Sequence, residues 1–194
     1  MGFSSMWRRS GAVVAAVLLA VVAVPQAVAT ASPQGATTTA SRAAQPGTGL
    51  NGFPEGYFFI RNVASGKVLD VKDNSKEAGA SIILWGRKAG GYDNQLWKYD
   101  NGFLVNKNSG LCLEVQGVSG TGIPPGTAVV QAERRERPHS INQLWAYNYQ
   151  HLMPYDPKVS LWGENGDVNT PGTKAVVGIR IHHEITQQWM FDTP

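Results

Sequence analysis

A short pattern repeated three times constrains the fold of this chain more than any other feature. The pattern is Gln-x-Trp, and its copies are Gln95–Trp97, Gln143–Trp145 and Gln187–Trp189. The three tryptophans are separated by 48 and 44 residues. A single copy would carry no information, but three copies at nearly even spacing predict a fold built from three equivalent units.

The interior of each unit repeats as well, as two β-rich runs joined by a glycine-containing turn. The paired runs are 65–71 with 79–85, 109–115 with 126–131, and 157–162 with 172–177. Such runs, separated by Gly, Asn, Asp and Pro, are typical of strands, and no stretch after Tyr57 has a helical period. We therefore expect an all-β fold with about four short strands in each unit.

A unit of this size cannot bury a hydrophobic face alone, so the three units are expected to share one core around a pseudo-threefold axis. Trp97, Trp145 and Trp189 are then equivalent core residues. Gln95, Gln143 and Gln187 should tie the last strand of each unit to neighbouring backbone. The alternative is that the tryptophans are ligand platforms.

The N-terminal residues have the pattern of a secretory signal peptide, which we place at residues 1–31. Arg8 and Arg9 precede an apolar run over 11–24, and Ala27–Ala29 or Ala29–Ala31 fits a cleavage site. The alternative is a membrane anchor, but the run is shorter than the ~20 residues of a span. Residues 32–52 form an Ala/Thr/Pro/Gly leader without apolar periodicity, expected to be flexible. We expect a secreted protein with no stable membrane span once mature, and a folded domain at 53–194.

Charge and cysteine content exclude several classes of protein. The formal net charge is +3, and Arg8 and Arg9 supply two of these charges. The remaining field is too weak to argue for nucleic acid or an anionic membrane. Cys112 is the single cysteine of the chain, so no internal disulfide is possible. We expect it to be a small buried residue, the alternative being a catalytic thiol.

The Gln-x-Trp triplets, the Leu69-Asp70-Val71 run and the Asn-Gln-Leu-Trp endings together resemble the ricin B-type lectins, a family of carbohydrate-binding β-trefoils. The resemblance covers about residues 57–191. It implies a β-trefoil with repeats at about 57–102, 103–149 and 150–194. It also implies up to one shallow sugar pocket in each repeat.

In that family a pocket combines a carboxylate, an aromatic platform and an amide. The resemblance assigns Asp70, Trp85 and Asn94 to these roles, with Gln95 in support. Tyr92, in the 90–92 loop, is a further candidate as a second wall of the pocket. A carboxylate makes charge-assisted bonds to two vicinal hydroxyls, an indole face suits the C–H groups of a sugar ring, and an amide both donates and accepts.

Other interpretations of these residues remain open. Asp70 could be a strand-end carboxylate satisfied by local backbone, and Tyr92 a loop aromatic that caps the edge of the core. Many family members have a polar residue where this chain has Ile83, so the sugar itself is left open. Galactose-type sugars are expected by resemblance alone.

The second and third repeats depart from the pocket pattern. In the second, Glu114 replaces the Asp and Ala132 stands at the platform position. In the third, the carboxylate, platform and amide positions hold Trp162, Gly178 and Thr186. We expect the third repeat to be structural, although an exposed Trp162 could stack on a ligand.

These observations predict a secreted, non-catalytic lectin without cofactor, in which oligomerisation is one way to compensate for a single weak site. No motif pairs carboxylates as a glycosidase requires. The neighbouring His182 and His183 should point to opposite faces of a strand, which argues against a metal site. The alternative function is a protein-binding β-trefoil, such as a protease inhibitor, acting through the loops at 117–125 or 133–140.

Overall fold

The computed structural model describes residues 52–117 and 120–194. The predicted signal peptide, and the predicted leader except for its last residue, lie outside these ranges. The described residues form strands and short 3-10 helices, with no α-helix among them. No helix within this part of the chain is long and apolar enough to cross a membrane. The predicted all-β class is therefore confirmed.

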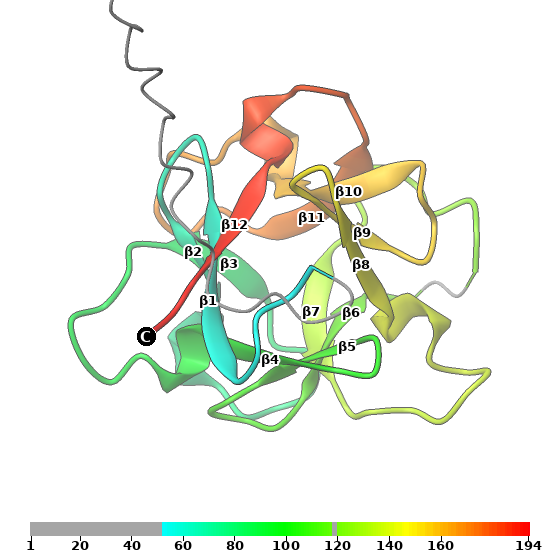
Figure 1. Cartoon of the computed structure of the whole chain (residues 1–194). Helices are drawn as coiled ribbons and strands as arrows, with labels where there is room; N and C mark the ends of the chain where they lie inside the picture. Colours follow the sequence, from blue (N-terminus) through cyan, green and yellow to red (C-terminus); the bar gives the residue numbers. More distant parts are fainter. Residues whose placement is uncertain (1–51, 118–119) are drawn as a thin grey trace, which may run out of the picture. The chain divides into compact units, whose positions relative to one another are not determined.

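The described residues contain twelve strands, which fall four to each predicted repeat (Figure 1). In the first repeat they are β1 (Tyr57–Asn62), β2 (Val68–Val71), β3 (Ile82–Trp85) and β4 (Leu96–Asp100). In the second they are β5 (Phe103–Asn106), β6 (Cys112–Val115), β7 (Val129–Ala132) and β8 (Trp145–Asn148). In the third they are β9 (His151–Pro154), β10 (Val159–Gly163), β11 (Ala175–Ile179) and β12 (Trp189–Asp192).

The first and last strands of each repeat close into a ring, and the middle two form a hairpin. Antiparallel ladders join β1 to β4, β4 to β5, β8 to β9 and β12 to β1. The two remaining junctions are made by bonds of 2.8 Å from Trp145 N to Gly102 O and from Trp189 N to Gln150 O. The hairpins are β2–β3, β6–β7 and β10–β11. This is the predicted β-trefoil.

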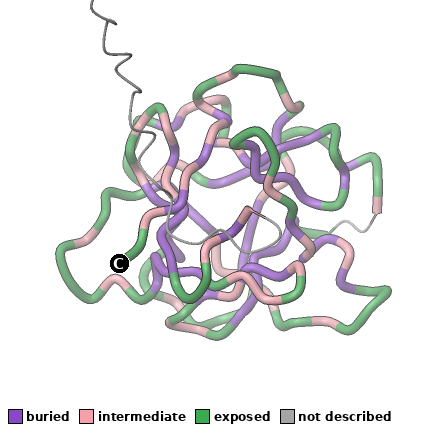
Figure 2. The backbone as a smooth tube through the Cα atoms, viewed as in Figure 1, coloured by how far each residue is buried: buried purple, intermediate pink, exposed green. Residues whose placement is uncertain are grey.

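The three repeated tryptophans lie in one hydrophobic core, as predicted. Trp97, Trp145 and Trp189 are at most 3% exposed. Each indole N–H donates to a carbonyl on the second strand of its own repeat: Leu69 O at 3.4 Å, Leu113 O at 2.9 Å and Leu161 O at 3.1 Å. A buried indole needs such a partner. In Figure 2 the strands around the ring are largely buried, whereas the connecting loops are exposed.

The repeated glutamines clamp the loop that follows the third strand. Their Nε2 groups donate to the carbonyls of Gly86, Glu133 and Ile179. Their Oε1 atoms accept from the backbone N–H groups of Lys88, Arg135 and Ile181. The predicted role of Gln95, Gln143 and Gln187 is confirmed. These bonds also show that positions 88, 135 and 181 are equivalent.

A glycine turn connects each repeat to another. Gly79 N donates to Gln131 O, Gly126 N to Val177 O and Gly172 N to Leu84 O, at 2.7–2.9 Å. The three glycines have φ of 85°, 87° and 90°, which side chains disfavour. The turn of one repeat thus borders the third strand of another.

Candidate functional site

The first repeat has a shallow pocket of about 250 Å³. Its lining residues are Asp70, Asp73, Asn74, Ile83, Trp85 and Lys88. Asp70 on β2 is paired with Ile83 on β3, and Trp85 lies two residues further along β3. Alternate residues of a strand share a face, so this pairing brings the carboxylate and the indole to one side of the hairpin. The sequence-predicted Asp70 and Trp85 therefore line a single pocket.

Asp70 is held by three side chains. Its Oδ1 accepts from Asn94 Nδ2 at 2.8 Å, and its Oδ2 accepts from Gln95 Nε2 at 2.9 Å. Lys88 Nζ lies 3.2 Å from Oδ2. A carboxylate offers about four acceptor positions, so one position, on Oδ1, remains for a ligand. Asp70 is thus fixed by side chains that are distant in sequence. The alternative, a strand-end carboxylate satisfied by local backbone, does not describe it.

The electrostatics of Asp70 reflect its burial. Its side chain is 4% exposed, and burial raises the pKa of the carboxyl group. The hydrogen bond from Gln95 and the charge of Lys88 oppose this rise. The two partners therefore favour the ionised form, which is the form that accepts hydrogen bonds from hydroxyl groups.

Asn94 and Gln95 lie behind Asp70 and do not line the pocket. Both are fully buried. Asn94 Nδ2 also donates to Val71 O at 2.9 Å, and Asn94 Oδ1 accepts from Lys88 Nζ at 2.8 Å. Because both ends of this amide are engaged, Asn94 orients Asp70 and Lys88. The resemblance had implied that Asn94 contacts the ligand directly. In the structure it is not placed to do so.

Tyr92 is not brought to the pocket either. Its ring packs against Phe59, with centroids 5.4 Å apart, beside the buried Val68 and Leu96. This small cluster is separate from the main core, and Tyr92 packs against it. Tyr92 is therefore not a second wall of the pocket. It is the loop aromatic at the edge of the core that the sequence left open as an alternative.

Trp85 presents a large apolar surface to solvent. Trp85 is one of the few large hydrophobic residues among those described that are exposed, with 42% of its surface accessible. The turn of the third repeat borders it, since a Cβ on Gly172 would lie 3.6 Å from Cζ3 of the indole. An exposed aromatic beside a buried carboxylate is typical of a binding surface.

Lys88 is a pocket residue that sequence reasoning missed. Its side chain is 32% exposed, and two of its three ammonium donors are used by Asp70 and Asn94. One signal could have revealed it. The equivalent position of the second repeat is also basic, and both repeats have an acid on their second strand.

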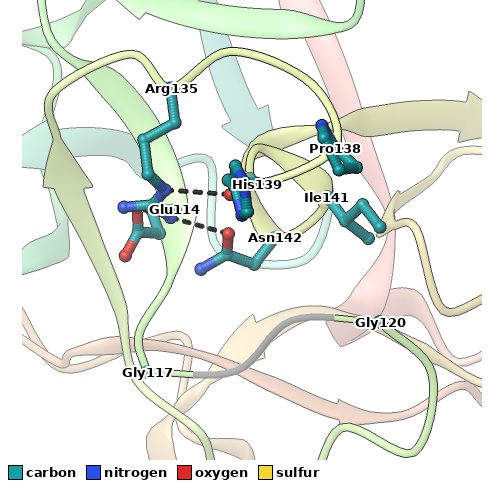
Figure 3. A pocket seen from close by; sticks show the side chains of 8 residues that line it. All are labelled: Glu114, Gly117, Gly120, Arg135, Pro138, His139, Ile141 and Asn142. Atoms are coloured by element: carbon teal, nitrogen blue, oxygen red, sulfur yellow. Dashed lines mark hydrogen bonds and ion pairs between the residues drawn. The ribbon is translucent and has the colours of Figure 1, made fainter.

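The second-repeat pocket repeats the acid–base pair without the platform. Arg135 Nη2 lies 2.6 Å from Glu114 Oε2, which also accepts from Gln143 Nε2 at 2.8 Å. The pocket has about 490 Å³ and also contains Asn142 and His139 (Figure 3). Ala132 is not among its lining residues. The pocket is larger and offers no indole.

The third repeat has lost both charges. Trp162 stands opposite Val176, the register that Asp70 and Ile83 have in the first repeat. Its indole N–H donates to Thr186 Oγ1 at 2.9 Å. Ile181 takes the place of Lys88 and Arg135. Acid and base are thus kept together or lost together, as expected if the cation offsets the cost of burying the acid.

Neither a metal site nor a reactive thiol is found in the part of the chain that the structure describes. No group of three or more His, Cys, Asp or Glu side chains there is arranged to hold a metal ion. Cys112 is fully buried on β6, as expected, and burial raises the pKa of its thiol to about 11.

Comparison with known proteins points to one family. Residues 50–132 match the ricin-type β-trefoil lectin domain-like family. Mucoricin from Rhizopus delemar is 47% identical over 58 residues, which are 29% of this chain and 40% of mucoricin. The chain therefore spans less than half the length of this relative.

Solved structures share the fold over most of the described residues. The designed threefold-symmetric protein ThreeFoil superposes with a TM-score of 0.62 at 25% identity, covering 72% of this chain and all of that one. The C-half of the earthworm R-type lectin in complex with GalNAc gives 0.60 at 20% identity, covering 71% and 98%. The Macrolepiota procera ricin B-like lectin in complex with lactose gives 0.55 at 24% identity, covering 72% and 96%. At these identities the two lectins show the fold alone.

Proposed function

On the premise that this chain is a β-trefoil related to the ricin-type lectins, we propose that it is a secreted, non-catalytic carbohydrate-binding protein with its sugar site in the first repeat. One observation carries the proposal. The first-repeat pocket is the described pocket that combines a buried carboxylate, Asp70, with an exposed indole, Trp85.

Each lining group has a distinct role in this proposal. The remaining acceptor position of Asp70 takes one sugar hydroxyl, and Trp85 stacks on the apolar face of the ring. The third donor of Lys88 reaches a second sugar oxygen, replacing the second contact to the carboxylate that the sequence predicted. Galactose-type sugars are proposed as ligands because the two natural lectins compared above were solved with GalNAc and with lactose.

A single pocket of this size sets the expected strength of binding. A dissociation constant on the order of 1 mM corresponds to about −4 kcal/mol. Useful retention then requires several sites acting together, either on an oligomer or on a glycan with repeated units.

The site is tested by titrating the folded protein with methyl β-galactoside and with lactose, followed by calorimetry or NMR. Asp70→Asn keeps the shape of the side chain but removes the charge, and we expect it to abolish binding. Glu114→Gln in the second repeat is the matched control and should bind like the parent. Unchanged binding by Asp70→Asn would show that the sugar site is misassigned.

The alternative, a protein-binding trefoil, receives less support from the loop at 133–140. Arg134 of this loop pairs with Asp100 at 2.6 Å, and Arg135 is turned inward to Glu114. Both arginines are thus engaged in ion pairs within the chain. A lectin should be eluted from an immobilised galactoside by free sugar, whereas an inhibitor should pass the column and block a protease.

A further inference from the structure

The third repeat contains a pocket of a different chemical kind. It has about 360 Å³, and its lining includes Trp162, Val176, Ile179, Ile181 and Pro125. None of the described residues that line it is charged. We propose that this pocket is a second, independent binding site, which takes a small uncharged aryl group stacked on Trp162.

Two positions of the third repeat differ from the first in a way that brings an indole into this pocket. Trp162 stands where the first repeat has Asp70, and Gly178 leaves room for its ring. Gly178 is equivalent to Trp85, and a Cβ at Gly178 would overlap Cε3 of Trp162. A Cβ at Gly166 would lie 3.0 Å from Cζ2. The tryptophan thus lies across β11 where a platform residue would stand, and the hydrogen bond to Thr186 fixes it there.

The rim of the pocket is also more apolar than the rims of the other two pockets. Ile179 and Ile181 are 61% and 47% exposed. Ile181 stands where the other two repeats have a cation bonded to the carboxylate. Single exposed isoleucines need no explanation, but these two lie beside the partly buried indole of Trp162 and extend its apolar surface.

The chemistry of the lining selects the ligand class. A pocket without charges cannot compensate a charged ligand for its lost hydration, so the ligand is uncharged. Small-molecule pockets of ~300 Å³ or more are mostly apolar with a few polar groups. Here Asn165 is the polar side chain among the lining residues, and it is exposed. An aryl ring stacks on an indole, and one hydroxyl substituent suits the amide.

The experiment follows the indole N–H resonance of Trp162 in the ¹⁵N-labelled full domain during titration with benzyl alcohol. We expect a saturable shift at Trp162 and none at Trp85. Ile181→Ser, an exposed change that leaves the core intact, should weaken binding about fivefold or more, because apolar contact area is lost. Trp85→Ala is the matched first-repeat control and should leave the titration unchanged.

Three results would overturn the proposal. The first is no shift at Trp162 up to about 20 mM benzyl alcohol, well above a millimolar dissociation constant. The second is an equal response to cyclohexanol, which would mean that the pocket does not select aryl groups. The third is a change from dimer to monomer in Ile181→Ser by sedimentation, which would make this surface a contact between copies of the chain.

Discussion

At the scale of single residues, the central feature of the first pocket is the pairing of Asp70 with a cation outside the repeated motif. Lys88 bonds to both Asp70 and Asn94, and it retains one donor for a ligand. Lys88 therefore contributes to the pocket in two ways, by its charge beside Asp70 and by the donor that it can offer to a ligand.

Replacing Lys88 by Met tests this dependence. The change removes the donor and raises the pKa of Asp70 further, since a charge that opposes the rise is lost. We expect galactoside affinity to fall about tenfold, equivalent to about 1.4 kcal/mol, measured by calorimetry at pH 7. Arg135→Met makes the same change in the second repeat and should leave affinity unchanged. Equal losses in both variants would contradict the assignment.

Two tryptophans of the first repeat should respond to substitution in opposite ways. Trp97 is fully buried, so Trp97→Ala should lower the free energy of unfolding by ~3–5 kcal/mol. Trp85 is exposed, so Trp85→Ala should remove galactoside binding with little change in stability. Urea denaturation and sugar titration of both variants separate the two roles. Normal stability in Trp97→Ala would mean that the core is misassigned.

Part of the site could be predicted from the sequence, because Asp70 and Trp85 occupy fixed places in a repeated strand pattern. Lys88 was missed, although the second repeat has a basic residue at the equivalent position, because its ion pair depends on how a loop folds back onto β2. The resemblance assigned Asn94 to the pocket but did not reveal that its side chain is buried. Its two amide ends are taken by neighbours that only the folded chain brings together.

At the scale of elements, strand β9 carries a buried histidine among positive groups. His151 is 2% exposed, and its Nδ1 has no hydrogen-bond partner among the described residues. The rings of His151 and His182 are 6.3 Å apart. Burial lowers the pKa of His151, and the charges of Arg180, His182 and His183 lower it further. The folded chain therefore favours the neutral form of His151.

This arrangement predicts acid sensitivity. The unfolded chain takes up a proton at His151 near pH 6.5, whereas the folded chain does so only at lower pH, so stability falls as pH drops below about 6.5. The raised pKa of Asp70 has the opposite effect on stability, because the folded chain binds this proton more readily than the unfolded chain. This effect occurs at lower pH, nearer the ordinary carboxyl pKa of 3.8. Urea denaturation at pH 7.5 and 5.5 measures the loss. His151→Leu should flatten it, and an unaltered pH dependence would refute the role of His151.

At the scale of the whole molecule, the shared core encloses the one cysteine of the chain. Cys112 is fully buried, and burial raises its pKa to about 11. The thiol is therefore protonated and inaccessible in the folded protein. We expect a thiol reagent at pH 8 to label it only after unfolding, with a rate that follows denaturant concentration. Rapid labelling without denaturant would show local opening around β6.

The threefold plan could be predicted from the sequence because three tryptophans and three glutamines serve the same purpose in each repeat. The turns that join the repeats could not be placed, since a glycine in a loop does not reveal which strand it will meet. Gly172, more than eighty residues from Trp85 in sequence, illustrates this.

The contact between Gly172 and Trp85, with the pairing of β1 and β12, has a consequence for the timing of synthesis. A nascent chain still attached to the ribosome would have Asp70 and Trp85 outside the exit tunnel long before Gly172 is made. The first-repeat pocket would then lack this neighbour, and β1 its pairing with β12, until the third repeat has been made. The candidate site of the first repeat would thus be complete only after the third repeat has folded against it.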